Sequence, residues 1–184
     1  MQSRKPKTCR QCKAEFMPWN STQTICSQPC AIEHARALGT KRQAKSRKAQ
    51  RISVMVRKNA LKTRSQWLRE SQQQFNRYTR IRDAKDPCIS CQRHHEGQYH
   101  AGHYLTVGGH PELRFNEDNC HKQCSACNNH LSGNIAAFRI NLVKKIGLER
   151  VESLEGPHDP LKLTIDEIKE IKAKYREMAK ELDQ

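Results

Sequence analysis

Apolar positions recur with a helical period in three stretches of the chain. The first stretch spans residues 65–82 and should dock on the segment after it, through the apolar residues Trp67, Leu68, Phe75, Tyr78 and Ile81. Asp86-Pro87 should end this helix. The second, "IAAFRINLVKKIG" at 135–147, predicts an amphipathic helix that stops at Gly147. The third begins after Thr164, which forms a capping-box pattern with Glu167, and predicts a last helix of roughly sixteen to twenty residues.

A period of two replaces the helical period around "YHAGHYLTVGG", residues 99–109. Side chains alternate faces in a strand, so His100 and Gly102 should share one face while Ala101 and His103 share the other. The Gly-rich turn reverses the chain, and "LRFNEDN" leads to the opposing strand. This stretch therefore predicts a β-hairpin, and a short helix should come after Cys127.

The stretch that ends in the first predicted helix is strongly basic. No acidic residue occurs from His34 through Arg69, while twelve Lys and Arg do. Residues 35–64 are therefore predicted to form a basic, at least partly helical arm that binds phosphates. The alternative is a solvated tether between two modules. The predicted DNA-binding residues are Lys41, Arg42, Lys45, Arg47, Lys48, Arg51, Arg57 and Lys58.

Composition limits the classes of protein to consider. The net charge is +15, from 34 Lys and Arg against 19 Asp and Glu, which favours a polyanionic partner such as nucleic acid. The apolar share of 35% predicts a small core. No apolar run suits a signal segment or a membrane span, so nine cysteines argue for zinc sites in a cytoplasm rather than for a secreted disulfide scaffold.

Eight of the nine cysteines form two sets with zinc-site spacing. "CRQC" and "CSQPC" contribute one set, and two Cys-x2-Cys pairs contribute the other; the ligands are Cys9, Cys12, Cys26 and Cys30, then Cys88, Cys91, Cys124 and Cys127. Each set can close a tetrahedral shell around one Zn²⁺. The free energy of metal binding would then compensate for the small hydrophobic core. Phe16, Trp19 and Ile25 should fill the first module, and Ser27 with Pro29 marks a helix start. Cys120 is left over as a small buried filler.

The order of these motifs along the chain resembles that of a known class of protein. Cys-x2-Cys, Gly-His, a Gly-rich turn, Asn, Cys-x2-Cys and Asn-x-His resemble the zinc-knuckle branch of the HNH (ββα-metal) nucleases. "PCISC", "AGHY", "PELRFNEDN", "HKQCSACNNHLSGN" and "IDEIKEIKAKYREM" are similar to the phage NinG/Rap family of recombination nucleases, and the likeness covers essentially the whole chain. It implies an α+β, zinc-stabilised fold with an HNH-like ββα-metal domain.

The resemblance also implies an active site. His103 would be the general base that activates water, and Asn119 would hold it through a backbone or side-chain hydrogen bond. One divalent cation, Mg²⁺ or Mn²⁺, would be held by His100, Asn128 and His130, with the choice between the last two left open. HNH sites often carry a carboxylate or histidine where this chain has Gly102. A histidine at position 100 would favour a softer metal or leave the site weak or inactive.

These expectations combine into one predicted protein. It is a metal-dependent, structure-selective endonuclease that acts on branched DNA such as Holliday junctions and D-loops in phage recombination, in the host cytoplasm at the nucleoid, with no membrane partner and a possible homodimer. The alternative is a non-catalytic zinc-dependent nucleic-acid-binding accessory protein. A catalytic-zinc hydrolase or deaminase fits worse, because both four-cysteine sets are full and no His-x-Glu occurs. The predicted divisions are a zinc module at 1–34, the arm at 35–64, the nuclease domain at 65–155, and a linker and last helix at 156–184.

Overall fold

The computed structural model describes residues 5–183. The first four residues of the predicted N-terminal module and the last residue of the predicted C-terminal segment lie outside this range. The chain forms two compact units, one up to Leu61 and one from Lys62 onward, and both helices and strands occur. The predicted four-part division stays a prediction. No helix in the described part of the chain is both long and apolar enough to cross a membrane.

The first unit joins a small cysteine-bearing module to a long helix. Strands β1 (Lys7–Thr8) and β2 (Glu15–Phe16) pair antiparallel, and α1 runs over Gln28–Ala60. Ser27 is the N-cap residue and a proline lies in the first turn, as predicted, although the Ser27 hydroxyl makes no capping hydrogen bond. Trp19 is 83% exposed, so its predicted role as filling is wrong. The module is too small to cover an indole.

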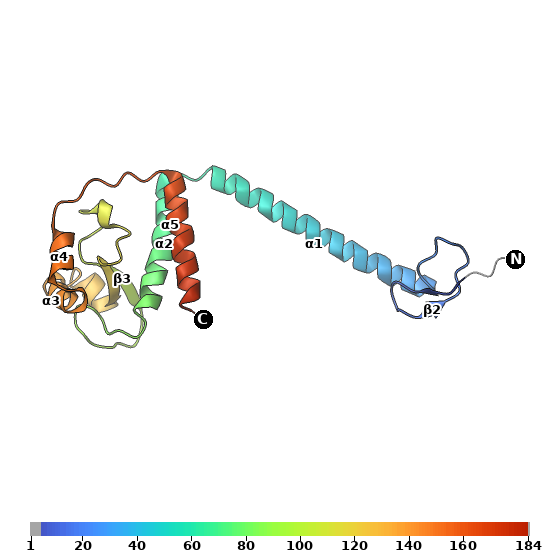
Figure 1. Cartoon of the computed structure of the whole chain (residues 1–184), viewed down its shortest axis with the longest axis horizontal. Helices are drawn as coiled ribbons and strands as arrows, with labels where there is room; N and C mark the ends of the chain where they lie inside the picture. Colours follow the sequence, from blue (N-terminus) through green and yellow to red (C-terminus); the bar gives the residue numbers. More distant parts are fainter. Residues whose placement is uncertain (1–4, 184) are drawn as a thin grey trace. The chain divides into compact units, whose positions relative to one another are not determined.

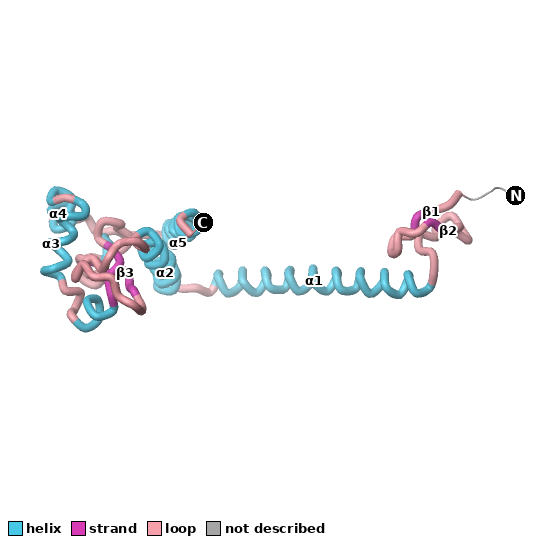
Figure 2. Tube along the Cα trace, turned by 90° about the horizontal axis from the view of Figure 1, so that it is seen from below, coloured by secondary structure: helices cyan, strands magenta, loops and turns pink. Residues whose placement is uncertain are grey.

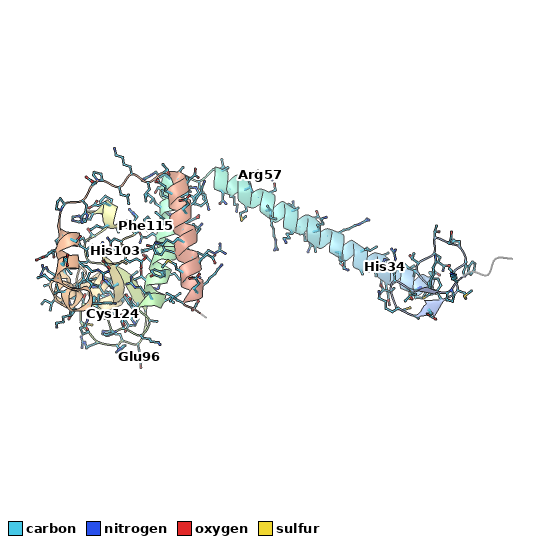
Figure 3. All side chains as sticks on the ribbon, in the orientation of Figure 1. His34, Arg57, Glu96, His103, Phe115 and Cys124 are labelled. Carbon is cyan, nitrogen blue, oxygen red and sulfur yellow. The ribbon has the colours of Figure 1, made fainter. Side chains whose placement is uncertain are left out.

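Helix α1 has no buried residue along its 33 positions. Side chains project from it along its length, as Figure 3 shows around His34 and Arg57. The eight predicted DNA-binding residues are all exposed. Since α1 has little packing of its own, its stability depends on helix propensity and on whatever neutralises its charge.

The second unit is a β-hairpin between two pairs of helices (Figure 1). Strands β3 (Tyr99–His103) and β4 (Cys120–Cys124) pair antiparallel. Helices α2 (Arg64–Arg82) and α5 (Ile165–Glu181) lie side by side on one face, in both Figure 1 and Figure 2. Helices α3 (Ile135–Ile146) and α4 (Leu148–Glu155) lie on the other face. Two short helices complete the unit, η1 (Pro111–Leu113) and the π-helix η2 (Ala126–His130).

Capping residues determine where the helices begin. Thr164 and Glu167 form the predicted capping box of α5, and Thr63 with Gln66 forms a second one at α2. Gly147, with φ +90°, ends α3 as predicted and directly precedes α4. The eight-residue α4 was not predicted. Helix α2 ends at Arg82, as predicted, and the buried Asp83 occupies its C-cap position, ahead of Asp86-Pro87.

Two apolar clusters hold the hairpin in place. On the α2 and α5 side, the buried members are Phe75, Tyr78, Cys120, Tyr175 and Ala179. On the α3 and α4 side, they are Ile89, Tyr104, Leu113, Phe138, Leu142, Val151 and Leu154. The strand alternation predicted from sequence therefore separates two cores, and it sends successive residues of β3 to opposite sides.

Candidate functional site

Both four-cysteine sets come together as predicted. The sulfur atoms of Cys9, Cys12, Cys26 and Cys30 all lie within 4.8 Å of one another, and so do those of Cys88, Cys91, Cys124 and Cys127. Four thiolates at this separation suit tetrahedral Zn²⁺. In the second unit, the set ties the turn before β3 to the end of β4. Each group could therefore hold one structural zinc ion.

Cys91 has an additional polar neighbour. His95 Nε2 lies 3.1 Å from Cys91 Sγ, and the backbone N–H of His95 donates to the Tyr99 hydroxyl at 2.6 Å. Burial opposes ionisation of the Cys91 thiol, but the His95 imidazole and backbone N–H groups outweigh it and lower the pKa to about 6. A thiolate is the form that binds zinc, so His95 supports the metal-binding state of this cysteine.

The ninth cysteine lies apart from both sets, as predicted. Cys120 is fully buried on β4, in the core beneath α2. Burial raises the pKa of its thiol to about 12, so it stays protonated. It behaves as a small apolar residue of the core.

His103, labelled in Figure 3, is the last residue of β3, and its ring lies near Phe75 of α2. Its Nε2 is 3.1 Å from the backbone oxygen of Arg114, and its ring centroid is 6.1 Å from that of Phe75. A carbonyl can only accept, so Nε2 carries the hydrogen and Nδ1 keeps its lone pair. The polar atom facing Nδ1 is the Cys120 sulfur at 3.8 Å, which is a weak partner.

The surroundings of His103 keep its imidazole neutral. Burial lowers the pKa of His103, the hydrogen bond to the Arg114 carbonyl raises it, and the positive charge of Arg114 lowers it again. The net effect is a pKa below its ordinary value. A neutral, oriented imidazole with a free lone pair is what a general base requires.

Asn119 holds the loop between the strands rather than His103 itself. It is fully buried. Its Oδ1 accepts from the Leu105 N–H at 2.8 Å, and its Nδ2 donates to the oxygens of Leu105 at 2.9 Å and Leu113 at 3.4 Å. Its own carbonyl accepts from the Tyr104 N–H at 2.8 Å. The predicted direct contact with His103 is therefore absent from the hydrogen bonds of the described residues, and Asn119 acts on the residues next to it.

The predicted cation ligands are only partly brought together. His100 Nε2 lies 3.5 Å from the Nδ2 of Asn129, a residue that was not predicted. Asn128 precedes Asn129 in the chain, and its side chain donates to Asn129 Oδ1 at 2.6 Å. His130 is exposed at the end of η2. Within residues 5–183, the only groups of three or more close His, Cys, Asp or Glu ligand atoms are the two cysteine sets.

His100 and His103 point to opposite faces of β3, because they are three residues apart in a strand. His100 shares its face with Gly102, as predicted. A Cβ on Gly102 would collide with the side chain of Gln123, which crosses above it on β4. Gln123 donates from Nε2 to Ser90 and Gly133, and its Oε1 is buried without a hydrogen-bond partner. The missing side chain at 102 therefore makes room for a carboxamide.

His121 belongs to a structural network at the end of α2. Its Nε2 donates to the Asp118 carbonyl at 3.0 Å, and its Nδ1 accepts from Arg82 at 3.1 Å. Asp83 is buried beside it, where it accepts from Arg82 at 2.8 Å and lies 3.3 Å from Lys145. Despite its burial, these partners hold the pKa of Asp83 well below its usual range. The network fastens α2 to β4 and leaves no free ligand atom on this imidazole.

The chain is similar to bacteriophage proteins over its whole length. The family described as "Bacteriophage Lambda NinG protein" matches residues 1–184. Protein ninG of Escherichia phage lambda is 40% identical over 183 residues, which cover 94% of this chain and 90% of that protein. Protein ninG of Escherichia phage 933W is 39% identical over 191 residues, which cover 96% and 93%. Protein ninG of Salmonella phage P22 is 38% identical over 183 residues, which cover 94% and 90%. No solved structure shows significant similarity.

Proposed function

The chain belongs to the NinG family of bacteriophage proteins, and on this basis we propose that it is a metal-dependent endonuclease of the HNH type that cuts branched DNA. The observation that carries the proposal is the state of His103. This imidazole is kept neutral by burial and fixed by the Arg114 carbonyl at 3.1 Å. The hairpin followed by the helix η2 also has the ββα order of that nuclease class.

In the proposed reaction, His103 removes a proton from the attacking water. Nε2 donates to the Arg114 carbonyl, so the lone pair of Nδ1 takes up the proton. The Cys120 thiol at 3.8 Å is only a weak hydrogen-bond partner, so it does not tie up the lone pair of Nδ1. Asn119 supports this geometry indirectly, since it fixes Leu105 and Leu113 on both sides of the loop.

A divalent cation would be held by His100 together with the carboxamides of Asn128 and Asn129, and by His130 if its side chain turns inward. When bound, the cation supplies charge stabilisation to the phosphate. None of these ligands carries a negative charge, so phosphate oxygens of the DNA would complete the coordination, and the imidazole of His100 favours a softer cation than Mg²⁺. Strand β3 pairs only with β4 among the described strands. Its other edge is free of strand partners, and DNA would approach His100 and His103 from that edge.

The basic arm would bind the phosphates of DNA, whatever the base sequence. The eight predicted DNA-binding cations of α1 have no acidic partner among the ion pairs of the described residues. Phosphate contacts of this kind position a protein on DNA without reading it. Two zinc modules and a basic helix suit a substrate with several duplex arms, and a homodimer would provide the two active sites that symmetric cutting of a junction needs.

A second candidate is a non-catalytic zinc-dependent DNA-binding accessory protein. Two observations favour it: His100 and His103 lie on opposite faces of β3, and Nδ1 of His103 faces Cys120 rather than open solvent. This candidate uses the same charge and the same zinc sites.

The two candidates differ in one assay. Purified protein is incubated with labelled four-way junction, flap and linear duplex DNA, with Mg²⁺, Mn²⁺ or no added divalent cation. The nuclease proposal predicts products from the branched substrates that require the added cation. Tight binding of all three substrates with no product under any condition supports the accessory protein instead.

A further inference from the structure

A groove runs along one face of α2. Its volume is about 430 Å³, and its walls are Ser65, Leu68, Arg69, Gln72, Gln73, Asn76 and Arg114. Six of these residues share one face of α2 at helical spacing, and Arg114 comes from the loop after η1. The lining contains two guanidinium groups and three carboxamides and no carboxylate.

The two arginines of the groove have no counter-ion in the described part of the chain. Glu70 adjoins Arg69 in sequence, but its carboxylate is bound to Lys62 and Lys172, each at 2.6 Å. Arg114 has only a long contact of 3.4 Å to the Gln72 carboxamide oxygen. Burial and the like charge of Arg64 both lower the pKa of Arg114. A half-buried guanidinium without an anion is unfavourable, so the groove favours an anionic ligand.

The carboxamides are ordered across the floor of the groove. Gln72 Nε2 donates to Asn76 Oδ1 at 2.8 Å, while Gln72 Oε1 faces Arg114. This chain of hydrogen bonds leaves the Nδ2 group of Asn76 as a donor on the same face as Arg69. Uncharged donors between guanidinium groups suit phosphate oxygens, which accept several hydrogen bonds at once.

Arg114 connects this groove to His103. Its backbone oxygen accepts the hydrogen bond from His103 Nε2 at 3.1 Å, and its guanidinium lines the groove. Phe75, one residue from Asn76 on α2, lies with its ring 6.1 Å from the imidazole. Arg114 is therefore shared between the groove, which its guanidinium lines, and the hydrogen bond that orients His103.

We propose that this groove binds the sugar–phosphate backbone of one DNA strand, with Arg69 and Arg114 neutralising phosphates and Asn76 donating to them. The identity of the polyanion as DNA rests on the proposed function. The groove lies wholly within the second unit, whereas α1 belongs to the first. It positions the strand beside His103 and takes no part in proton transfer.

The test measures DNA binding by the full-length, zinc-loaded protein without added divalent cation, so that no cleavage is needed. Arg69→Gln and Arg114→Gln are compared with Arg176→Gln, which removes an exposed cation of α5 outside the groove. Each groove variant should weaken binding of a four-way junction about three- to tenfold and lower the slope of log K against log salt by about one. Arg176→Gln should change binding less than about twofold. Arg114→Lys, which keeps the charge, should recover part of the affinity.

Wild-type affinity and salt slope in both groove variants, with unchanged circular dichroism, would overturn the proposal. So would a loss of affinity that appears only with RNA of the same sequence and not with the DNA junction. The nuclease proposal fails separately. A wild-type protein that never cuts DNA, while both groove variants bind more weakly than the Arg176→Gln control, would support the proposed DNA-binding groove and contradict the nuclease proposal.

Discussion

The Nε2 atom of His103 donates a hydrogen bond to the backbone oxygen of Arg114 at 3.1 Å. The side chain of Arg114 cannot change this contact, because the acceptor belongs to the backbone. One residue thus fixes the tautomer of the imidazole and also presents its guanidinium to the groove along α2. The orientation of the proposed base and the approach of the proposed substrate depend on the same short loop.

The first prediction concerns the pH dependence of cleavage. Burial lowers the pKa of His103 below the ordinary value of 6.5. The neutral form therefore persists to lower pH than in an exposed histidine, and the pH at which single-turnover cleavage falls to half of its maximum should lie below 6.5. Junction binding measured at each pH separates binding from chemistry. A rate that halves above pH 6.5 while binding is constant would contradict this role of His103.

The second prediction concerns metal content. The protein should contain two zinc ions per chain, and Cys124→Ser should lose one of them. Zinc binding is worth about 10–16 kcal/mol in small modules, which exceeds the stability of many domains, so the second unit should lose cooperative unfolding. Elemental analysis and thermal melting measure both effects. Cys120→Ala is the matched control, because Cys120 belongs to neither set, and loss of zinc in this variant would contradict the assignment.

The third prediction concerns the loop fastened by Asn119. Asn119→Ala should lower the free energy of unfolding by about 2–3 kcal/mol, because it leaves buried backbone groups without partners. The Leu105 amide, which donates to Asn119 at 2.8 Å, should lose protection against hydrogen exchange. Asn128→Ala, at a half-exposed position, should change stability by less than about 0.5 kcal/mol. Equal effects of the two variants would show that Asn119 has no special role in the loop.

The fold was predictable where local signals decide it. The hairpin, α2, α3 and α5 follow from apolar periodicity and from caps such as Thr164, which act within one turn of helix. The two cysteine sets follow from spacing, because a metal restricts the separation of its ligands. The prediction that Trp19 fills the first module was wrong. Burial of a large side chain depends on how much surface the small module has to cover it, and sequence periodicity does not give that surface.

The site was predictable in its residue types and less so in its contacts. Strand alternation correctly separated His100 from His103, but the partner of each depends on chain segments distant in sequence. Arg114 meets His103 across eleven residues of loop, and Asn129 meets His100 from η2, a π-helix whose side-chain spacing differs from that of an α-helix. The buried, unpaired Gln123 oxygen occupies the space that a side chain at Gly102 would fill.

The fourth prediction concerns the basic arm. Replacement of the eight predicted DNA-binding Lys and Arg residues of α1 by Gln should weaken DNA binding and flatten its salt dependence, because each lost phosphate contact reduces the slope by about 0.9. The measurement is DNA affinity at four or more salt concentrations. A control in which only the lysines of the set are changed to arginine keeps every charge and should keep the slope. An unchanged slope in the Gln variant would remove α1 from the DNA interface.

The most direct test is single-turnover cleavage of a four-way junction with Mg²⁺ or Mn²⁺ by the wild-type protein and by His103→Ala, with junction affinity measured for both. General-base catalysis contributes about 100- to 10,000-fold, so the variant should cut at least about 100-fold more slowly while its affinity stays within about twofold of wild type. Cleavage by His103→Ala at the wild-type rate, or the absence of any cleavage by the wild-type protein, would contradict the assignment of His103 as the general base of a nuclease.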